Sequence, residues 1–257
     1  MLLAIDIGNT QIVMGVFEGE KMVNSWRITT TPYRTADECW TQVMAFCQAV
    51  GVGHHDLTEC AVSSVVPAMT ASFKRMVVDR MPWSKPPFIF HPEEYPHIKN
   101  EYDNPKAVGA DRICNAVAGY QLFGGPLIIV DFGTATTFDV VGNYGEYKGG
   151  VIAPGLETAT AELYRRAAKL TKVDLKFPDN IIGKSTDTSM QAGIMFGSQE
   201  MVDGIVRRIW KELGGECKVI ATGGIAPVIV PESQTVSQIV PFLVLDGLNR
   251  IYRKMIS

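Results

Sequence analysis

Two short segments constrain the fold of this chain more than any other feature of its sequence. Ile5-Asp6-Ile7-Gly8-Asn9-Thr10 and Val130-Asp131-Phe132-Gly133-Thr134 each resemble an apolar strand that ends in Asp-x-Gly. Glycine lets the backbone bend sharply and approach a ligand closely. Neighbouring N–H and hydroxyl groups can then point at phosphate oxygens, while the aspartate holds a cation or its water shell. Two such turns, about half of the 257-residue chain apart, predict a phosphotransferase that grips a nucleotide triphosphate between two similar halves.

Length and charge narrow the class of protein further. A chain of 257 residues can form two modest domains with a substantial core. The net charge of −3 argues against nucleic acid as the main partner. Asp6 interrupts the first apolar run, and no run reaches the roughly 18 apolar residues that cross a bilayer, so we expect neither a secretory segment nor a membrane partner.

The cysteines and histidines indicate a reducing compartment. The five cysteines are odd in number and scattered, which is typical of buried thiols in the cytoplasm rather than of disulfides or a zinc site. The histidines show no metal-binding spacing, and we expect the pair His54-His55 to lie on the surface.

The order of the predicted elements repeats once along the chain. The first set comprises the strands Leu2–Ile7, Gln11–Phe17 and Met22–Ile28, a helix behind the capping box at Thr35 to Glu38, the strand Cys60–Val66, the helix Ala68–Arg80 and the short strand Phe88–Phe90. The second set comprises the strands Leu127–Asp131, Thr136–Val141 and Tyr147–Ile152, the helices Leu156–Leu170 and Thr188–Leu213, and the strand Val219–Ala221. A helix over Val108–Phe123 joins the sets, and a helix over Phe242–Met255 ends the chain.

This repetition predicts a duplicated α/β fold with a nucleotide cleft between its copies. We place the first domain at residues 1–118 and the second at 119–257, with the last helix able to pack back across the boundary. One larger α/β domain with chance similarity between its halves is the alternative.

A third acidic position lies outside the two turns. Asp111 stands near the start of the predicted helix Val108–Phe123, where the helix dipole stabilises a carboxylate. Phosphoryl transfer to an alcohol needs a group that orients the hydroxyl and accepts its proton, and aspartate is a typical choice. Asp111 could also be an ordinary helix-start charge. The neighbouring Arg112 could pair with a substrate anion or with Asp103.

Three further glycine-containing segments have separate interpretations. Thr222-Gly223-Gly224 follows a buried strand, where it permits either a flat adenine ring on the backbone or a plain strand-to-helix turn. Asp131-Phe132-Gly133 matches a protein-kinase tripeptide, but the other kinase motifs are missing from the sequence. Gly183-Lys184-Ser185 resembles the end of a Walker A loop, which fails because Pro178 stands where that loop needs glycine.

Taken in order, these motifs resemble those of the type III pantothenate kinases. The resemblance covers nearly the whole chain. It rests on Asp6 to Thr10, Asn104-Pro105, Val108 to Arg112, Asp131 to Thr137, Gly149-Gly150-x-Ile152-x-Pro154-Gly155, Gly183 to Thr186, and Thr222 to Gly224. It implies duplicated actin-like (ribonuclease H-like) domains, as in the superfamily of actin, sugar kinases and heat-shock chaperones. It also implies ATP-dependent phosphorylation of pantothenate to 4'-phosphopantothenate, the first step of coenzyme A biosynthesis.

The resemblance also implies roles for individual residues, with Asp111 as the general base. ATP and its phosphates would be bound by Asp6, Ile7, Gly8, Asn9, Thr10, Gln11, Ile12, Val13, Gly133, Thr134, Thr222, Gly223 and Gly224. Pantothenate would be bound by Tyr102, Gly109, Ala110, Asp111, Arg112 and Thr186. Asp131 would hold a monovalent cation, K⁺ or NH₄⁺, and Asp6 is a candidate Mg²⁺ ligand. Family members are homodimers, in which Thr186 would reach the substrate from the partner subunit.

One departure from the family pattern and three rival functions stay open. Ile12-Val13-Met14 is apolar where many relatives carry a basic residue, which bears on ATP affinity and cation dependence at that end. A kinase for a sugar or another small alcohol would share the fold. A non-enzymatic protein-binding regulator would be expected to lack Asp6, Asp111 or Asp131, and all three are present. A phosphatase would release phosphate without an acceptor.

Overall fold

The structure, a computed structural model, describes residues 1–167 and 170–256 and divides into two compact units. The first unit comprises Met1–Leu122 with Leu243–Ser257, and the second comprises Phe123–Phe242. The last helix therefore belongs with the first unit, whereas the sequence division at residue 118 assigned it to the second half and allowed it to pack back.

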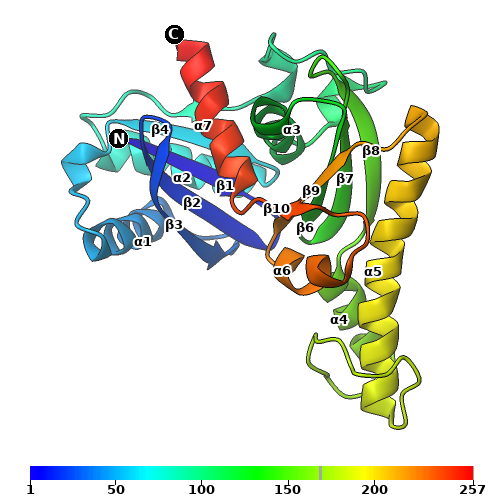
Figure 1. The fold of residues 1–257 in the computed structure, drawn as a ribbon. Coiled ribbons are helices and arrows are strands. Elements are labelled where there is room, and N and C mark those ends of the chain that lie inside the picture. The colour runs from blue at the N-terminus through cyan, green and yellow to red at the C-terminus, as the bar shows by residue number, and fades with distance from the viewer. Residues whose placement is uncertain (168–169, 257) are drawn as a thin grey trace. The chain divides into compact units, whose positions relative to one another are not determined.

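The first unit is a mixed five-stranded sheet covered by helices (Figure 1). Its strands have the order β3-β2-β1-β4-β5, with β1 antiparallel to β2 and parallel to β4. The strands are β1 (Leu2–Ile7), β2 (Gln11–Glu18), β3 (Lys21–Thr29), β4 (Glu59–Ser64) and β5 (Phe88–Ile89). The helices are α1 (Ala36–Ala49), α2 (Pro67–Arg80), α3 (Ala110–Phe123) and α7 (Leu243–Ile256).

The second unit repeats the strand order of the first. Its sheet runs β10-β9-β6-β7-β8, so three consecutive antiparallel strands are again followed by parallel strands on the other side of the first one. The strands are β6 (Leu127–Phe132), β7 (Ala135–Val141), β8 (Tyr147–Pro154), β9 (Lys218–Gly223) and β10 (Gln238–Ile239). The helices are α4 (Leu156–Arg166), α5 (Thr186–Leu213) and α6 (Ala226–Ile229). The predicted duplication is confirmed by this topology.

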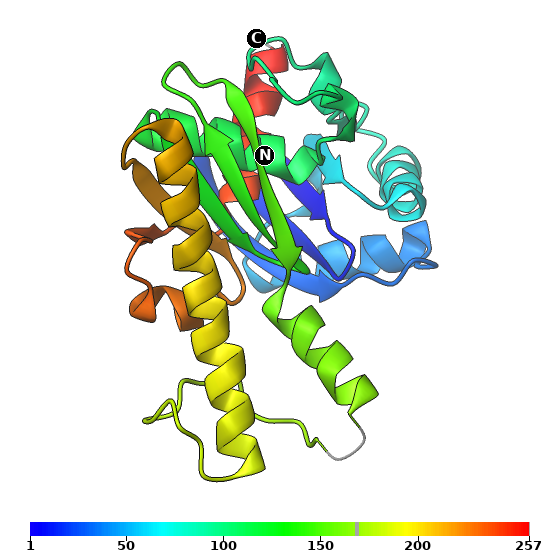
Figure 2. The same ribbon diagram turned by 90° about the vertical axis from the view of Figure 1, so that its right-hand side faces the viewer.

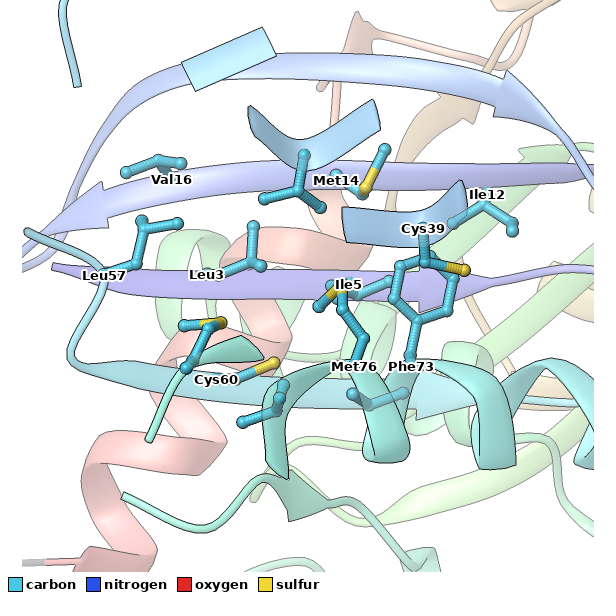
Figure 3. Packing of buried hydrophobic residues seen from close by; sticks show 14 of the residues in the cluster. Leu3, Ile5, Ile12, Met14, Val16, Cys39, Leu57, Cys60, Phe73 and Met76 are labelled. Carbon is cyan, nitrogen blue, oxygen red and sulfur yellow. The ribbon is translucent and has the colours of Figure 1, made fainter. Parts of the chain in front are cut away.

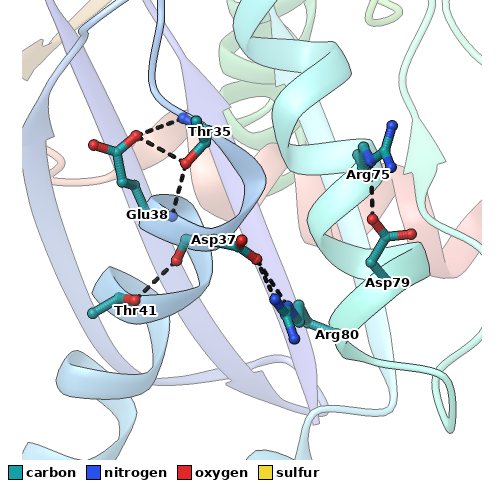
Figure 4. A network of polar contacts seen from close by, with 7 residues as sticks. All are labelled: Thr35, Asp37, Glu38, Thr41, Arg75, Asp79 and Arg80. Atoms are coloured by element: carbon teal, nitrogen blue, oxygen red, sulfur yellow. Dashed lines mark hydrogen bonds and ion pairs between the residues drawn. The ribbon is translucent and has the colours of Figure 1, made fainter.

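Helix α1 shows how local sequence sets the ends of an element (Figure 4). The Glu38 carboxylate accepts a hydrogen bond from the Thr35 N–H at 2.7 Å, and the Thr35 hydroxyl accepts one from the Glu38 N–H at 3.3 Å. The predicted capping box is therefore present, and it satisfies N–H groups that a helix start leaves without partners. Gly51 follows the helix with φ of +74°, a conformation that glycine adopts without strain.

The core of the first unit forms around β1 (Figure 3). Leu3 and Ile5 are almost fully buried and belong to one apolar cluster with Phe73 and Met76 of α2. Helix α7 packs against β1, β2 and β4. Burying a Leu or Ile side chain fully contributes about 1.5–3 kcal/mol to folding stability. The apolar strand β1 is therefore held firmly in the core, and the position of its carboxyl end is fixed.

Helices α4 and α5 of the second unit both extend beyond its sheet (Figures 1 and 2). Helix α4 ends at Arg166, whereas the sequence predicted a helix to Leu170; residues 168 and 169 of that prediction lie outside the described residues. Helix α5 begins at Thr186, two positions earlier than predicted, because the Ser185 hydroxyl caps it by accepting from the Thr188 N–H at 3.2 Å.

A buried carboxylate ties the middle of α5 to the segment before β10. Asp203 is fully buried and accepts hydrogen bonds from the Ser233 and Thr235 hydroxyls, each at 2.6 Å. The Gln234 N–H at 3.0 Å and the Gln199 side chain also donate to it. Burial raises the pKa of Asp203, but these donors outweigh burial and hold the pKa below its usual value. The network joins parts of the chain about 30 residues apart and replaces the water that a buried charge loses.

Several expectations about the surface and the thiols are confirmed. His54 and His55 are exposed. All five cysteines are free thiols, four of them buried. Within residues 1–167 and 170–256, no helix combines the length and apolar character that crossing a bilayer requires.

Candidate active site

The first Asp-x-Gly turn is a tight connection between β1 and β2. The Gly8 N–H donates to the Gln11 carbonyl at 3.0 Å, and the Thr30 hydroxyl donates to the Gly8 carbonyl at 2.7 Å. A Cβ built at Gly8 would stand 3.0 Å from the Gln11 carbonyl, which leaves little room for a side chain. Asn9 and Thr10 are exposed at the tip. The turn is thus braced by Thr30, the residue that follows β3, and presents its polar tip to solvent.

Not every predicted phosphate-site residue offers its side chain. Ile7 and Ile12 are fully buried and pair with each other across β1 and β2, so their side chains belong to the core. Any contact they make with a ligand comes from their backbones. Val13 lies opposite Asp6 in the same pair of strands, so the apolar replacement noted in the sequence stands directly across from the carboxylate.

Asp6 and Asp111 share one neighbourhood within the first unit. Asp6 is aligned with Ser63 of β4, and both stand near the carboxyl ends of parallel strands. The thiol of Cys114 is buried one turn along α3 from Asp111, and the charges of both carboxylates act on it. Burial raises its pKa well above the usual value, and the charges of Asp6 and Asp111 raise it further, while the Ser63 side chain opposes them. The Ser63 side chain also lies near this thiol, and a Cβ at Gly109 would stand 3.7 Å from Val65, so the start of α3 lies beside the carboxyl ends of β1 and β4.

Asp111 is a half-buried carboxylate in the first turn of α3. Its Oδ1 accepts from the Arg112 N–H at 2.9 Å. Burial raises the pKa of Asp111, whereas the Arg112 N–H and guanidinium act in the opposite direction without cancelling the effect of burial. A Cβ at Gly109 would overlap the Asp111 carboxylate, so glycine leaves room for that rotamer. A carboxyl with a raised pKa is a stronger base than an ordinary aspartate.

The remaining residues of the predicted substrate motif lie around this helix start. Arg112 is buried with only 7% of its surface exposed, and Ala110 is also buried. Tyr102 is half-buried, and its N–H donates to the Asn100 side chain at 3.0 Å. A buried guanidinium next to a half-buried carboxylate is a typical arrangement for binding an anionic substrate.

The second Asp-x-Gly turn joins β6 to β7 in the second unit. Asp131 is half-buried near the end of β6, and Gly133 and Thr134 are exposed in the turn. Asp131 is aligned with Thr222 of β9, and Phe132 is aligned with Gly223. Because β6 and β9 are parallel, the second phosphate turn and the Thr222–Gly224 segment lie at the same edge of this sheet. Of the three predicted nucleotide-binding segments, the first turn therefore lies at the edge of the first sheet, and the other two lie together at the edge of the second sheet.

Gly223 has a steric requirement for glycine. Its φ is +94°, and a Cβ there would stand 2.5 Å from the Phe132 carbonyl oxygen. A side chain at this position would be strained and would separate β9 from β6. Thr222 is almost fully buried, so the part of this motif open to a ligand is its glycine backbone. Thr186 is exposed at the first position of α5 in the second unit.

Asp6 fits Mg²⁺ in the way that phosphate-transferring proteins commonly bind it. The described residues contain no group of three or more His, Cys, Asp or Glu side chains arranged to hold a metal. Mg²⁺ usually needs only one or two carboxylates, with substrate phosphates and water completing its octahedron. Asp6, half-buried beside a turn with exposed polar groups, meets that requirement. Asp131 is a second half-buried carboxylate, in the other unit.

The sequence did not predict two residues that lie near Asp6 and Asp111, namely Ser63 and Cys114. Ser63 becomes a neighbour of Asp6 only through the parallel register of β1 and β4, which no local pattern encodes. Cys114 carried a usable signal, because residues three apart on a helix lie on one face and Asp111 was already singled out. It was assigned only as one of the buried thiols, which is confirmed but incomplete.

Solved structures of known proteins share the fold. A protein of Campylobacter jejuni described as a Baf family transcriptional activator has a TM-score of 0.61 at 17% identity, with 98% of each chain covered. A 2-dehydro-3-deoxygalactonokinase protein of Sinorhizobium meliloti has a TM-score of 0.56 at 12% identity, covering 99% of this chain and 97% of that chain. At such identities the likeness shows the fold alone, which is the expected α/β fold with duplicated actin-like domains.

Sequence comparison identifies the family. The model of the type III pantothenate kinase family matches residues 2–208. A type III pantothenate kinase of Geobacter sulfurreducens is 45% identical over 254 residues, with 99% of each chain covered. One of Frankia alni is 46% identical over 256 residues, with 100% of each chain covered. The chain belongs to the type III pantothenate kinase family.

Proposed function

We propose that this protein phosphorylates pantothenate with ATP to form 4'-phosphopantothenate, the first step of coenzyme A biosynthesis. The pantothenate primary hydroxyl oxygen attacks the γ-phosphorus, the bond to the bridging oxygen of ADP breaks, and the hydroxyl proton passes to Asp111. Family membership supports the substrate, since the matched relatives carry pantothenate kinase in their names. The observation that supports the chemistry is that the start of α3, which carries Asp111, lies beside the strand ends that carry Asp6 and Ser63, with both carboxylates near enough to Cys114 to raise its pKa.

Asp111 is the proposed general base because its surroundings suit that role. Its carboxylate stands at a helix start and its pKa is raised by burial, so it takes a proton more readily than an exposed aspartate. Tyr102, Gly109, Ala110 and Arg112 would contact pantothenate, with the Arg112 guanidinium pairing with the pantothenate carboxylate. Burial of Arg112 supports this pairing, because a guanidinium in a low-dielectric place binds an anion more strongly.

The triphosphate is proposed to bind through the two Asp-x-Gly turns. Backbone N–H groups and hydroxyls of Asp6 to Val13 would contact one end of it, and Gly133 and Thr134 the other. Thr222, Gly223 and Gly224 would hold the adenosine. Asp6 would hold Mg²⁺, which when bound neutralises charge on the transferring phosphoryl group. Such turns bind phosphate by N–H groups and bound cations rather than by a Walker lysine.

Two statements about the cellular form are also part of the proposal. We propose a homodimer in which Thr186 of one subunit reaches the pantothenate bound to the other; its exposure at the start of α5 is compatible with such a contact. We propose that the protein acts in the cytoplasm, where its five free thiols would stay reduced.

An ATP-consumption assay with and without pantothenate tests the function. We expect ADP formation only with pantothenate, and faster in potassium or ammonium buffer than in sodium buffer. A panel of sugars and other small alcohols tests the rival kinase activity. Phosphate release without any acceptor would instead indicate a phosphatase. If ATP is not consumed with pantothenate or with any other acceptor, the proposed kinase function is wrong.

The pH dependence of turnover follows from Asp111. A general base must be ionised, so kcat/KM for pantothenate should fall as pH drops through the Asp111 pKa, which lies above the ordinary aspartate value of 3.8. Initial rates across the acidic range at saturating ATP measure this limb. If the pKa measured from this acidic limb is no higher than that of an ordinary aspartate, another group takes the proton.

Asp131→Ala tests the cation site. We expect the variant to lose its response to potassium and ammonium, because the half-buried carboxylate that offsets the cation charge is gone. Rates in KCl, NH₄Cl and NaCl at equal ionic strength measure the response. Asp174→Ala, which removes an exposed aspartate of the same unit, should respond like the original protein. Stimulation that survives in Asp131→Ala would place the cation elsewhere.

A further inference from the structure

The turn between β6 and β7 is held from outside by the start of α4. The Thr134 carbonyl accepts two hydrogen bonds, one from the Gly155 N–H at 3.2 Å and one from the Thr158 hydroxyl at 2.7 Å. Gly155 is the N-cap residue of α4, and Thr158 lies in the first turn of that helix. Neither residue is part of the Asp-x-Gly turn, and the sequence motifs give Thr158 no role.

Gly155 is needed for space and not for an unusual backbone. Its φ of −67° and ψ of 151° are open to any residue. A Cβ built there, however, would overlap the carbonyl oxygens of both Gly133 and Thr134. Both carbonyls of the turn therefore lie against the Gly155 backbone, at a distance that only glycine permits.

The direction of these carbonyls fixes the direction of two N–H groups. In a planar trans peptide the C=O and N–H point to opposite sides. The Gly133 carbonyl shares its peptide with the Thr134 N–H, and the Thr134 carbonyl shares its peptide with the Ala135 N–H. With both carbonyls drawn towards α4, the two consecutive N–H groups face away from it. Consecutive N–H groups turned to one side form an anion-binding concavity.

We propose that Gly155 and Thr158 are positioning residues, which hold the Gly133–Thr134 turn in the conformation that binds the ATP phosphates. The inference rests on the proposed function of that turn. Thr158 acts only through the Thr134 carbonyl, and Gly155 acts by leaving room for both carbonyls. Without either contact, the peptides of the turn can rotate. The N–H groups are then no longer preorganised, and ordering them when ATP binds lowers the affinity.

Thr158→Val tests the hydrogen bond with little change in shape. A net hydrogen bond contributes about 0.5–1.5 kcal/mol, and the exposure of Thr158 favours the lower part of that range, so we expect KM for ATP to rise about two- to fivefold. We expect kcat and KM for pantothenate to be unchanged and Tm to fall by no more than a few degrees. Thr158→Ser keeps the hydroxyl and should restore the original KM for ATP.

Two further variants separate this role from a general effect on α4. Thr160→Val removes a threonine hydroxyl that donates to the Leu156 carbonyl at 2.6 Å within the same helix and does not touch the turn; KM for ATP should not change. Gly155→Ala should raise KM for ATP by at least about tenfold, because its Cβ displaces two carbonyls. If Gly155→Ala does not fold, the two Thr158 variants still decide the question.

Titration with a non-hydrolysable ATP analogue keeps the two hypotheses apart. If the unaltered protein binds the analogue but phosphorylates no pantothenate, the proposed function fails, and the affinities of the Thr158 variants still test the positioning role. If Thr158→Val binds ATP as tightly as the original protein, or if Thr160→Val is weakened equally, the positioning role is wrong whatever the acceptor.

Discussion

Asp111→Asn is expected to lower kcat by at least about a hundredfold while leaving the protein folded. The amide cannot accept the hydroxyl proton, yet its oxygen can still accept the hydrogen bond from the Arg112 N–H. The side chain keeps its size, so Gly109 still accommodates it. Steady-state rates with saturating ATP and pantothenate measure the loss.

The same substitution should not destabilise the protein and is expected to raise Tm slightly at neutral pH. Burial raises the pKa of the folded Asp111 carboxyl above its unfolded value. Ionising it therefore costs the folded state free energy at every pH above that raised pKa, and the cost disappears as the group becomes protonated. The uncharged amide avoids the cost. A residue that lowers stability and supports turnover is typical of a functional site.

Asp37→Asn is the matched control, because Asp37 holds the second position of α1 as Asp111 does of α3. Asp37 is exposed and pairs with Arg80 at 2.5 Å (Figure 4). Its loss should cost less than about 1 kcal/mol of stability and leave kcat unchanged. If Asp111→Asn retained a kcat near that of Asp37→Asn, Asp111 would not be the base.

Much of the fold could be predicted because its strands and caps are encoded locally. β1 was placed at its observed bounds, since a buried strand between turn signals leaves few alternatives. The capping box of α1 fixed the start of that helix. The two-residue strand β10 and the four-residue helix α6 were missed, because elements so short have no periodicity to detect; β5, equally short, was predicted from the apolar run Phe88–Phe90. The start of α5 was predicted two positions late, because capping by Ser185 was not recognised.

The residues of the candidate site could be predicted only where they belong to a motif of consecutive residues. Asp6 and Asp131 stand in repeated turns, and Asp111 stands at a helix start, so each could be proposed from the sequence. Ser63 and Thr158 could not, because their relevance depends on strand register and on a helix packing against a turn. Contacts between distant segments are set by the whole fold and leave no local pattern.

Asp203→Ala is expected to destabilise the second unit by about 3 kcal/mol or more. Alanine removes the acceptor for the Ser233 and Thr235 hydroxyls and the Gln234 N–H; the Thr235 bond is buried and the other two are partly buried. Each buried donor without a partner costs about 1–3 kcal/mol, and water entering the gap recovers only part of the total. Chemical unfolding, together with hydrogen exchange of the segment before β10, measures the loss.

Acid and a surface control make this prediction specific. The pKa of the folded Asp203 carboxyl is lowered, so its stabilisation is present above the unfolded pKa and is lost as pH falls through the folded one. The difference between the original protein and Asp203→Asn should therefore shrink in acid. Asp79→Ala removes an exposed carboxylate paired with Arg75 at 2.9 Å and should cost less than about 1 kcal/mol (Figure 4). A similarly small cost for Asp203→Ala would mean that water replaces the carboxylate and that the network is not what joins α5 to β10.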